Sequence, residues 1–147
     1  MNALAAYPVS DPKQAAEELV GAHTPEWLDA FAEALQRQRA GGELRRILQV
    51  WGLSQSEAAR RFGVSRQSVA KWLASGVPAS RVAAIADLSV ATDLLEHYLR
   101  RDRIPGVVRR VAAALGERSL LELLEAGDHR GVLAGCRAMF DFSRAQG

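Results

Sequence analysis

The chain has 147 residues, of which 48% are hydrophobic and 24% are charged, and its formal net charge is +2. This length and composition suit one globular domain of normal size or two very small ones, and they exclude a polyelectrolyte. The single cysteine, Cys136, excludes an intramolecular disulfide and is compatible with a reducing cytoplasm, where we expect the protein to be located. No apolar run approaches the ~20 residues that a membrane-spanning helix needs, so no membrane partner is predicted.

Residues 1–40 predict an acidic helical arm, because they carry three basic and six acidic side chains, a net charge of −3. Ser10 or Asp11 could cap a helix with Pro12 at its first position, and Thr24-Pro25 opens another helix in the same way. An apolar stripe at helical spacing follows, made of Trp27, Leu28, Phe31 and Leu35. The stripe is expected either to pack on the next module or to form a dimer or partner surface. After this stripe, Gly41-Gly42 is predicted to interrupt the helix and so to separate the acidic arm from the following basic module.

Residues 41–79 carry six basic and two acidic side chains, a net charge of +4. After a first helix ending near Gly52, Ser54-x-x-Glu57 has the pattern of a capping box that opens a short helix. Gly63 supplies the turn that ends this helix, and Ser65 caps a second helix predicted over 66–73. The core side of that second helix is formed by Val69, Trp72 and Leu73. Two short helices joined in this way predict a helix-turn-helix rather than a generic helical hairpin.

The second helix of this pair has an exposed polar edge that suits DNA recognition. Arginine can bind guanine with two hydrogen bonds, glutamine can bind adenine, and serine can bind a base or a phosphate. The predicted base-reading residues are therefore Arg66, Gln67 and Ser68. The predicted contacts to the DNA backbone are Gln55, Arg60, Ser65 and Lys71. Because one such helix gives little affinity, we expect a homodimer on a two-fold, double-stranded DNA operator.

The remaining residues predict further helices. One long helix with a broad apolar side is expected over 79–101, followed by a turn at 104–106 and a short helix over 107–115. Ser119-x-x-Glu122 is a second capping box and opens a helix over 120–126. Asp128 is predicted to cap the last helix, whose apolar stripe consists of Val132, Leu133, Cys136, Met139 and Phe140.

No residue pattern indicates an enzyme. The three histidines, His23, His97 and His129, lack metal-ligand spacing, and one cysteine cannot form a zinc cluster. Glycine-rich phosphate-binding patterns are absent. Asp128 and His129 are adjacent on a helix and so point ~100° apart, which favours capping over acid–base chemistry. We therefore predict no catalytic residues, no metal site and no cofactor, and a buried, unreactive Cys136.

From about Glu43 onward the chain resembles the Xre/MbcA/ParS family of antitoxins. Residues 53–78, LSQSEAARRFGVSRQSVAKWLASGVP, match a pattern that many repressors share. Residues 118–142, RSLLELLEAGDHRGVLAGCRAMFDF, are similar to the closing helices of the family. The Trp and the Pro-Asn pair that usually precede those helices are missing, and residues 1–40 have no counterpart in the short members.

The resemblance implies an all-α fold, in which a Cro-type helix-turn-helix bundle is followed by a long linking helix and a small C-terminal helical domain. The expected divisions are an acidic arm (1–40), the DNA-binding module (41–78) and a toxin-binding or dimerisation region (79–147). The implied partner is a RES-domain toxin that consumes NAD, and the pair would repress its own operon. Carried over by position, the toxin-facing residues are Arg130, Arg137, Met139, Phe140, Phe142 and Arg144.

Other interpretations of the C-terminal half stay open from the residues alone. Met139, Phe140 and Phe142 could instead close the core of this protein. The chain could be a stand-alone transcription regulator whose C-terminal half dimerises or senses an effector. It could also be a helical interaction protein that retains a vestigial DNA-binding module.

Overall fold

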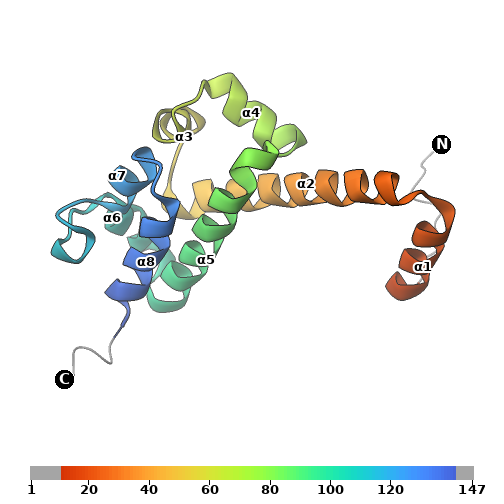
Figure 1. Ribbon diagram of the computed structural model, residues 1–147. Coiled ribbons are helices and arrows are strands. Elements are labelled where there is room, and N and C mark those ends of the chain that lie inside the picture. The colour runs from red at the N-terminus through yellow and green to blue at the C-terminus, as the bar shows by residue number, and fades with distance from the viewer. Residues whose placement is uncertain (1–10, 142–147) are drawn as a thin grey trace. The chain divides into compact units, whose positions relative to one another are not determined.

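A computed structural model describes residues 11–141 of the chain. The elements of the described residues are helices, which confirms the predicted all-α class (Figure 1). An isolated β-bridge joins Ala112 and Arg118. Across residues 11–141, none of the helices combines the length and the apolar character required to cross a membrane. The chain divides into two compact units, one up to Leu35 and the other from Gln36 onward.

The first unit ends at Leu35, within the range predicted as the acidic arm (1–40). It contains α1 (Pro12–Ala22) and the beginning of α2 (Pro25–Trp51). Side-chain oxygens of Asp11 and Thr24 cap these helices, and each helix has its proline in the first turn, as the sequence predicted.

The apolar stripe of the arm is present on α2. The Trp27 and Phe31 rings stack with their centroids 5.2 Å apart. Trp27, Phe31 and Leu35 are exposed, and Leu28 is half-buried. The two expected coverings of this stripe, the next module or a dimer or partner surface, both stay predictions.

The second unit holds the rest of α2 and all later elements. Its further helices are α3 (Gln55–Phe62), α4 (Arg66–Ser75), α5 (Val82–Tyr98), α6 (Ile104–Arg109), α7 (Leu120–Glu125) and α8 (His129–Met139). Short 3₁₀ turns connect some of them, namely η2 (Ala79–Arg81), η3 (Arg101–Arg103) and η4 (Ala113–Leu115).

Helix α2 continues through Gly41-Gly42, so the predicted helix break at this pair was wrong. Gly41 is buried, and a Cβ built on it would lie 2.7 Å from the carbonyl oxygen of Trp72 and 3.2 Å from the Cα of Gly76. The missing side chain therefore lets the end of α4 approach the backbone of α2. The glycine serves close packing rather than a change of chain direction.

The helix bounds predicted for 79–115 also need correction. The long helix expected over 79–101 is α5, which begins after the η2 turn and ends at Tyr98. Residues 104–106, predicted as a turn, begin α6, because proline is tolerated in the first turn of a helix. The helix expected over 107–115 ends at Arg109, and the chain is then extended before η4.

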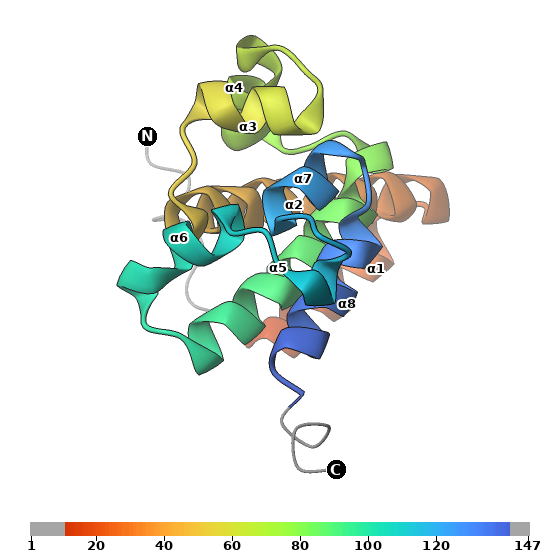
Figure 2. The ribbon, with the colours of Figure 1, turned by 90° about the vertical axis from the view of Figure 1, so that its left-hand side faces the viewer.

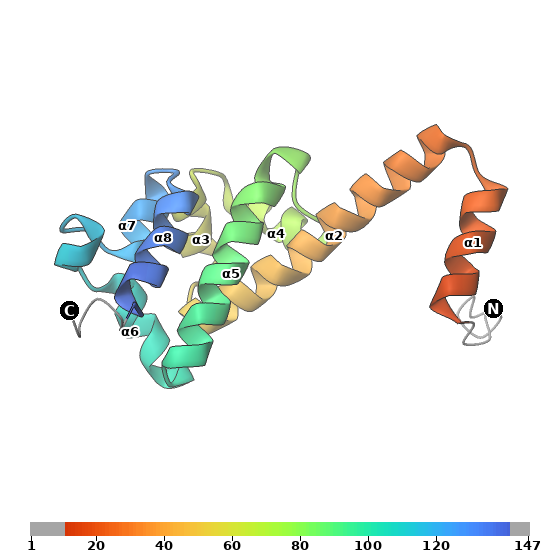
Figure 3. The same ribbon diagram turned by 60° about the horizontal axis from the view of Figure 1, so that its bottom comes forward.

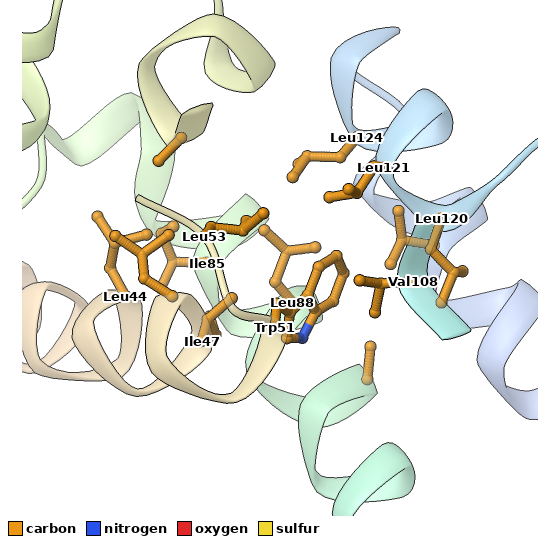
Figure 4. Packing of buried hydrophobic residues seen from close by; sticks show 14 of the residues in the cluster. Leu44, Ile47, Trp51, Leu53, Ile85, Leu88, Val108, Leu120, Leu121 and Leu124 are labelled. Carbon is orange, nitrogen blue, oxygen red and sulfur yellow. The ribbon is translucent and has the colours of Figure 1, made fainter. Parts of the chain in front are cut away.

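One hydrophobic core joins the elements of the second unit. Figure 4 shows side chains of α2, α5, α6 and α7 converging around Trp51. Trp51 is fully buried, and its indole Nε1 donates a hydrogen bond to Thr92 Oγ1 at 3.0 Å. Helices α5 and α8 pack side by side (Figure 3). The predicted boundary between 78 and 79 therefore lies inside a single compact unit.

A polar cluster at the surface joins α2 to α5. The Arg46 guanidinium lies 2.7 Å from Glu96, 2.9 Å from Asp93 and 3.1 Å from Glu43. The Ser89 hydroxyl donates to the Glu43 carboxylate at 2.6 Å. This hydrogen bond and the neighbouring Arg46 hold the pKa of Glu43 below its ordinary value. The cluster fixes the orientation of two long helices that carry the core.

Candidate functional site

Helices α3 and α4 form the predicted helix-turn-helix (Figure 1). The Ser54 hydroxyl caps α3 by accepting from the Glu57 amide at 3.1 Å. Gly63 ends α3 with φ +67°, a left-handed conformation that glycine adopts without a Cβ clash. The Ser65 hydroxyl caps α4 by accepting from the Ser68 amide at 3.1 Å. Each of these caps was predicted from the sequence.

Packing between the two short helices fixes which side of α4 faces outward. Val69 and Trp72 are buried as predicted, whereas Leu73 is half-buried. The Phe62 and Trp72 rings meet edge to face with centroids 5.9 Å apart. The Arg81 guanidinium covers the Trp72 ring at 5.3 Å. The opposite side of α4 is consequently left for solvent or a ligand.

The predicted base-reading residues lie in the first turn of α4. Arg66 and Gln67 are exposed, and Lys71 is exposed one turn later. Ser68 is half-buried, and its hydroxyl lies 3.0 Å from the Ser65 hydroxyl, within the helix cap. Arg66 and Gln67 are thus freer than Ser68 to reach a base.

The residues predicted to contact the DNA backbone are distributed over α3 and α4, and two of them stand at helix N-termini. Gln55 is the first residue of α3, and Ser65 immediately precedes α4; both are exposed. Arg60 is exposed, 4.0 Å from the Glu57 carboxylate. The N-terminal amides of a helix favour a nearby anion, so this arrangement can bind phosphate.

Glu57 does not complete the predicted capping box. Its carboxylate instead lies 2.9 Å from the Arg109 guanidinium and 3.8 Å from that of Arg61. Arg61 in turn pairs with Glu125 at 2.8 Å. These ion pairs join α3 to α6 and α7, and they were not visible in the sequence because their partners are 52 and 64 residues apart.

A groove of ≈ 520 Å³ forms a second candidate site, between α5 and α8. Val90, Leu94 and Tyr98 follow one another at four-residue spacing and so share a face of α5. Val90 is 41% exposed and Tyr98 is 45% exposed. The Tyr98 ring stacks on Phe140 with centroids 4.7 Å apart and an interplanar angle of 18°. The groove is lined by Leu94, Tyr98, Ala134, Arg137, Ala138, Phe140 and Asp141.

Four of the residues predicted to face a toxin are described, and they lie in or near this groove. Arg130 and Arg137 are exposed on α8, and Arg137 lines the groove. Met139 and Phe140 are half-buried against the core, so each is shared between the core and the surface. Phe142 and Arg144 lie outside the described residues.

The fold is similar to that of a chain in the crystal structure of the M. tuberculosis MbcT–MbcA toxin–antitoxin complex. The two chains are 26% identical with a TM-score of 0.55, and the similarity covers 67% of this chain and 91% of the other. The chain therefore has an antitoxin-like fold. No family model matches the chain, and no curated protein is significantly similar to it in sequence.

Within this antitoxin-like fold, α8 is held by contacts at its start and by its core-facing side. Asp128 caps α8 by accepting from the Gly131 amide at 2.8 Å, as predicted. His129 Nδ1 lies 2.7 Å from an Asp87 carboxylate oxygen on α5, a pair that was not predicted. Cys136 is buried, as expected, and burial raises the pKa of its thiol to about 12. No group of three His, Cys, Asp or Glu side chains in residues 11–141 could hold a metal ion.

Proposed function

We propose that this protein is the antitoxin of a type II toxin–antitoxin pair and not an enzyme. It neutralises an NAD-consuming RES-domain toxin through protein–protein contact in the cytoplasm, and it represses its own operon through the helix-turn-helix. The observation that carries the proposal is the structural similarity to a chain of the MbcT–MbcA complex, which covers 91% of that chain. The sequence resemblance to Xre/MbcA/ParS antitoxins points to the same function.

The groove between α5 and α8 is the proposed toxin-binding surface. Arg130, Ala134 and Arg137 recur at helical spacing, so they form one exposed edge of α8 beside the groove. The stacked Tyr98 and Phe140 rings supply an apolar floor. Aromatic and arginine side chains provide much of the binding energy at protein interfaces, which makes this combination suited to a partner protein.

Blocking the groove is expected to weaken toxin binding. Ala134→Arg places a long side chain in the groove and Arg137→Glu reverses a charge at its edge, while both positions are exposed and should not disturb folding. We expect each Kd to rise at least about tenfold, or ~1.4 kcal/mol. The measurement is calorimetric titration with the protein encoded by the neighbouring gene, together with rescue of growth on co-expression.

Arg118→Glu is the matched control, because this arginine is exposed and lies outside the groove. It should leave the Kd unchanged. A neighbouring gene product that is harmless when expressed alone, or that never co-purifies with this protein, would remove the antitoxin proposal.

For the second half of the function, we propose that a homodimer reads a two-fold DNA operator with α4. Arg66 and Gln67 contact bases, assisted by Ser68, while Gln55, Arg60, Ser65 and Lys71 contact phosphates. The exposure of these side chains, apart from half-buried Ser68, supports this assignment, as does the position of Gln55 and Ser65 at helix N-termini. A dimer of such units requires half-sites about one helical turn of DNA apart.

Arg66→Ala or Gln67→Ala is expected to cost ~1–3 kcal/mol of binding at the operator and to leave binding to a scrambled duplex unchanged. Lys71→Ala should instead weaken binding to both duplexes. It should also reduce by ~1 the magnitude of the slope of log binding constant against log salt concentration. Fluorescence anisotropy titrations over a range of salt concentrations measure both effects. Equal losses on the two duplexes for Arg66→Ala would argue against base reading.

A stand-alone transcription regulator is the second candidate function. The similarity to the MbcT–MbcA structure covers 67% of this chain, so the rest has no counterpart there. This additional part of the chain favours a stand-alone regulator. In this case the C-terminal half would dimerise or sense an effector. Operator binding without any toxic neighbouring gene product would support this function over the first.

A further inference from the structure

The densest positive charge of the chain lies outside the helix-turn-helix. Residues 100–110, which we name the basic segment, contain five arginines and one aspartate, a net charge of +4 within 11 residues. Within the helix-turn-helix, residues 60–71 reach the same net charge over 12 residues. All five arginines of the basic segment are exposed: Arg100, Arg101, Arg103, Arg109 and Arg110.

The basic segment is attached beside the start of α3. The Arg109 guanidinium donates to the Gly52 carbonyl oxygen at 3.4 Å and pairs with Glu57 at 2.9 Å. A Cβ built on Gly52 would lie 3.2 Å from the ring of Pro105. Figure 2 shows α6 next to the link between α2 and α3. The segment therefore borders the end of α3 where Gln55, one of the proposed phosphate contacts, lies.

Some of these arginines have a partner within the protein and others do not. Arg109 is held by Glu57, and Arg100 lies 3.3 Å from Asp102. Among residues 11–141, the guanidinium groups of Arg101, Arg103 and Arg110 have neither a hydrogen-bonding nor an ion-pair partner. Arginines this close together repel one another, and an external anion would relieve the repulsion.

We propose that the basic segment is a second DNA-contacting surface, which binds phosphates flanking the bases that α4 reads. This inference deepens the proposed DNA-binding function and rests on it. The planar guanidinium group can bind a phosphate with two hydrogen bonds, so Arg101, Arg103 and Arg110 are suited to the role. Phosphate contacts carry no sequence information. The segment therefore adds affinity and lengthens the footprint without changing which operator is preferred.

The test compares two triple variants of the full chain, R101A/R103A/R110A and R101K/R103K/R110K. The alanine variant removes three charges, whereas the lysine variant keeps them at the same positions. Binding is measured over a range of salt concentrations on two duplexes, one carrying the region upstream of the gene and one carrying a scrambled sequence. The salt slope is the slope of the logarithm of the binding constant against the logarithm of the salt concentration. We expect its magnitude to fall by up to ~3 per protomer for the alanine variant on both duplexes. The lysine variant should keep the wild-type slope.

Because all three positions are exposed, the thermal unfolding midpoint should not change, and Arg110→Ala alone should lower the slope by ~1. An alanine variant that retains the wild-type slope overturns the inference. If that variant also loses affinity for the neighbouring gene product, the basic segment binds an acidic protein surface instead.

Further outcomes separate this inference from operator reading by α4. In one such outcome, the wild-type protein binds both duplexes equally while the alanine variant still loses salt slope. That result would contradict operator reading by α4 but would support the inference about the basic segment. A wild-type protein without any salt-dependent DNA binding overturns both.

Discussion

Trp51→Ala is expected to lower the free energy of unfolding by ~3–5 kcal/mol, the cost of truncating a large buried aromatic side chain. Trp51 is fully buried where side chains of α2, α5, α6 and α7 meet (Figure 4). The change removes apolar burial and leaves a cavity that helices on all sides cannot close. Because a domain of this size has only ~5–15 kcal/mol of stability, most of it would be lost. Urea unfolding followed by circular dichroism measures the effect.

Trp51→Phe separates the loss of packing from the loss of the indole hydrogen bond. Phenylalanine keeps most of the apolar contact but cannot donate to Thr92 Oγ1. The Thr92 hydroxyl still donates to the Leu88 carbonyl at 2.7 Å, so it stays satisfied. We therefore expect a clearly smaller loss than for Trp51→Ala. Equal losses for the two variants would mean that the cavity is unimportant.

Gly76→Ala is expected to destabilise the protein by ~2–6 kcal/mol, because two penalties of ~1–3 kcal/mol each act at this position. The first is conformational, since Gly76 has φ +102°. The second is steric, since a Cβ would lie 2.8 Å from the carbonyl oxygen of Arg37. The neighbouring chain cannot shift easily: the Val77 amide donates to that oxygen at 3.1 Å, and Arg37 Nε donates to the Val77 carbonyl at 2.8 Å.

Gly127→Ala is the matched control. Gly127 also has a positive φ, +77°, but a Cβ built on it meets nothing within 4 Å. It should therefore show only the conformational penalty, ~1–2 kcal/mol. If thermal unfolding gave the same loss for Gly76→Ala and Gly127→Ala, the close approach of α2 to the end of α4 would have no energetic importance.

The features that sequence analysis identified depend on residues close together in the chain. A cap involves a side chain and an amide three residues later, so Ser54, Ser65 and Asp128 could be found from spacing alone. Ser119 and Glu122 form a complete capping box, with both reciprocal hydrogen bonds present. The core side of α4 followed from helical periodicity in the same way.

The features that sequence analysis missed depend on distant partners. Glycine favours both a helix break and a close backbone approach, and only the position of α4 decides between them at Gly41. Glu57 had the right spacing for a capping box, but Arg109 of α6 binds its carboxylate. Tyr98 belonged to the apolar side expected for the long helix, yet it is 45% exposed and lines the groove. Periodicity shows that a face is apolar and does not show what covers it.

The single core of the second unit has a consequence for the lifetime of the protein in a cell. Helix α8 packs on α5, and α5 carries Ile85 and Leu88 into the same core as Trp51 and Leu53, which frame the start of α3. A protease that cut away α8 would expose this core and unfold α3 and α4 as well. Under the proposed function, degradation would free the toxin and the promoter in one event, so that new transcripts are made whenever the old antitoxin is destroyed.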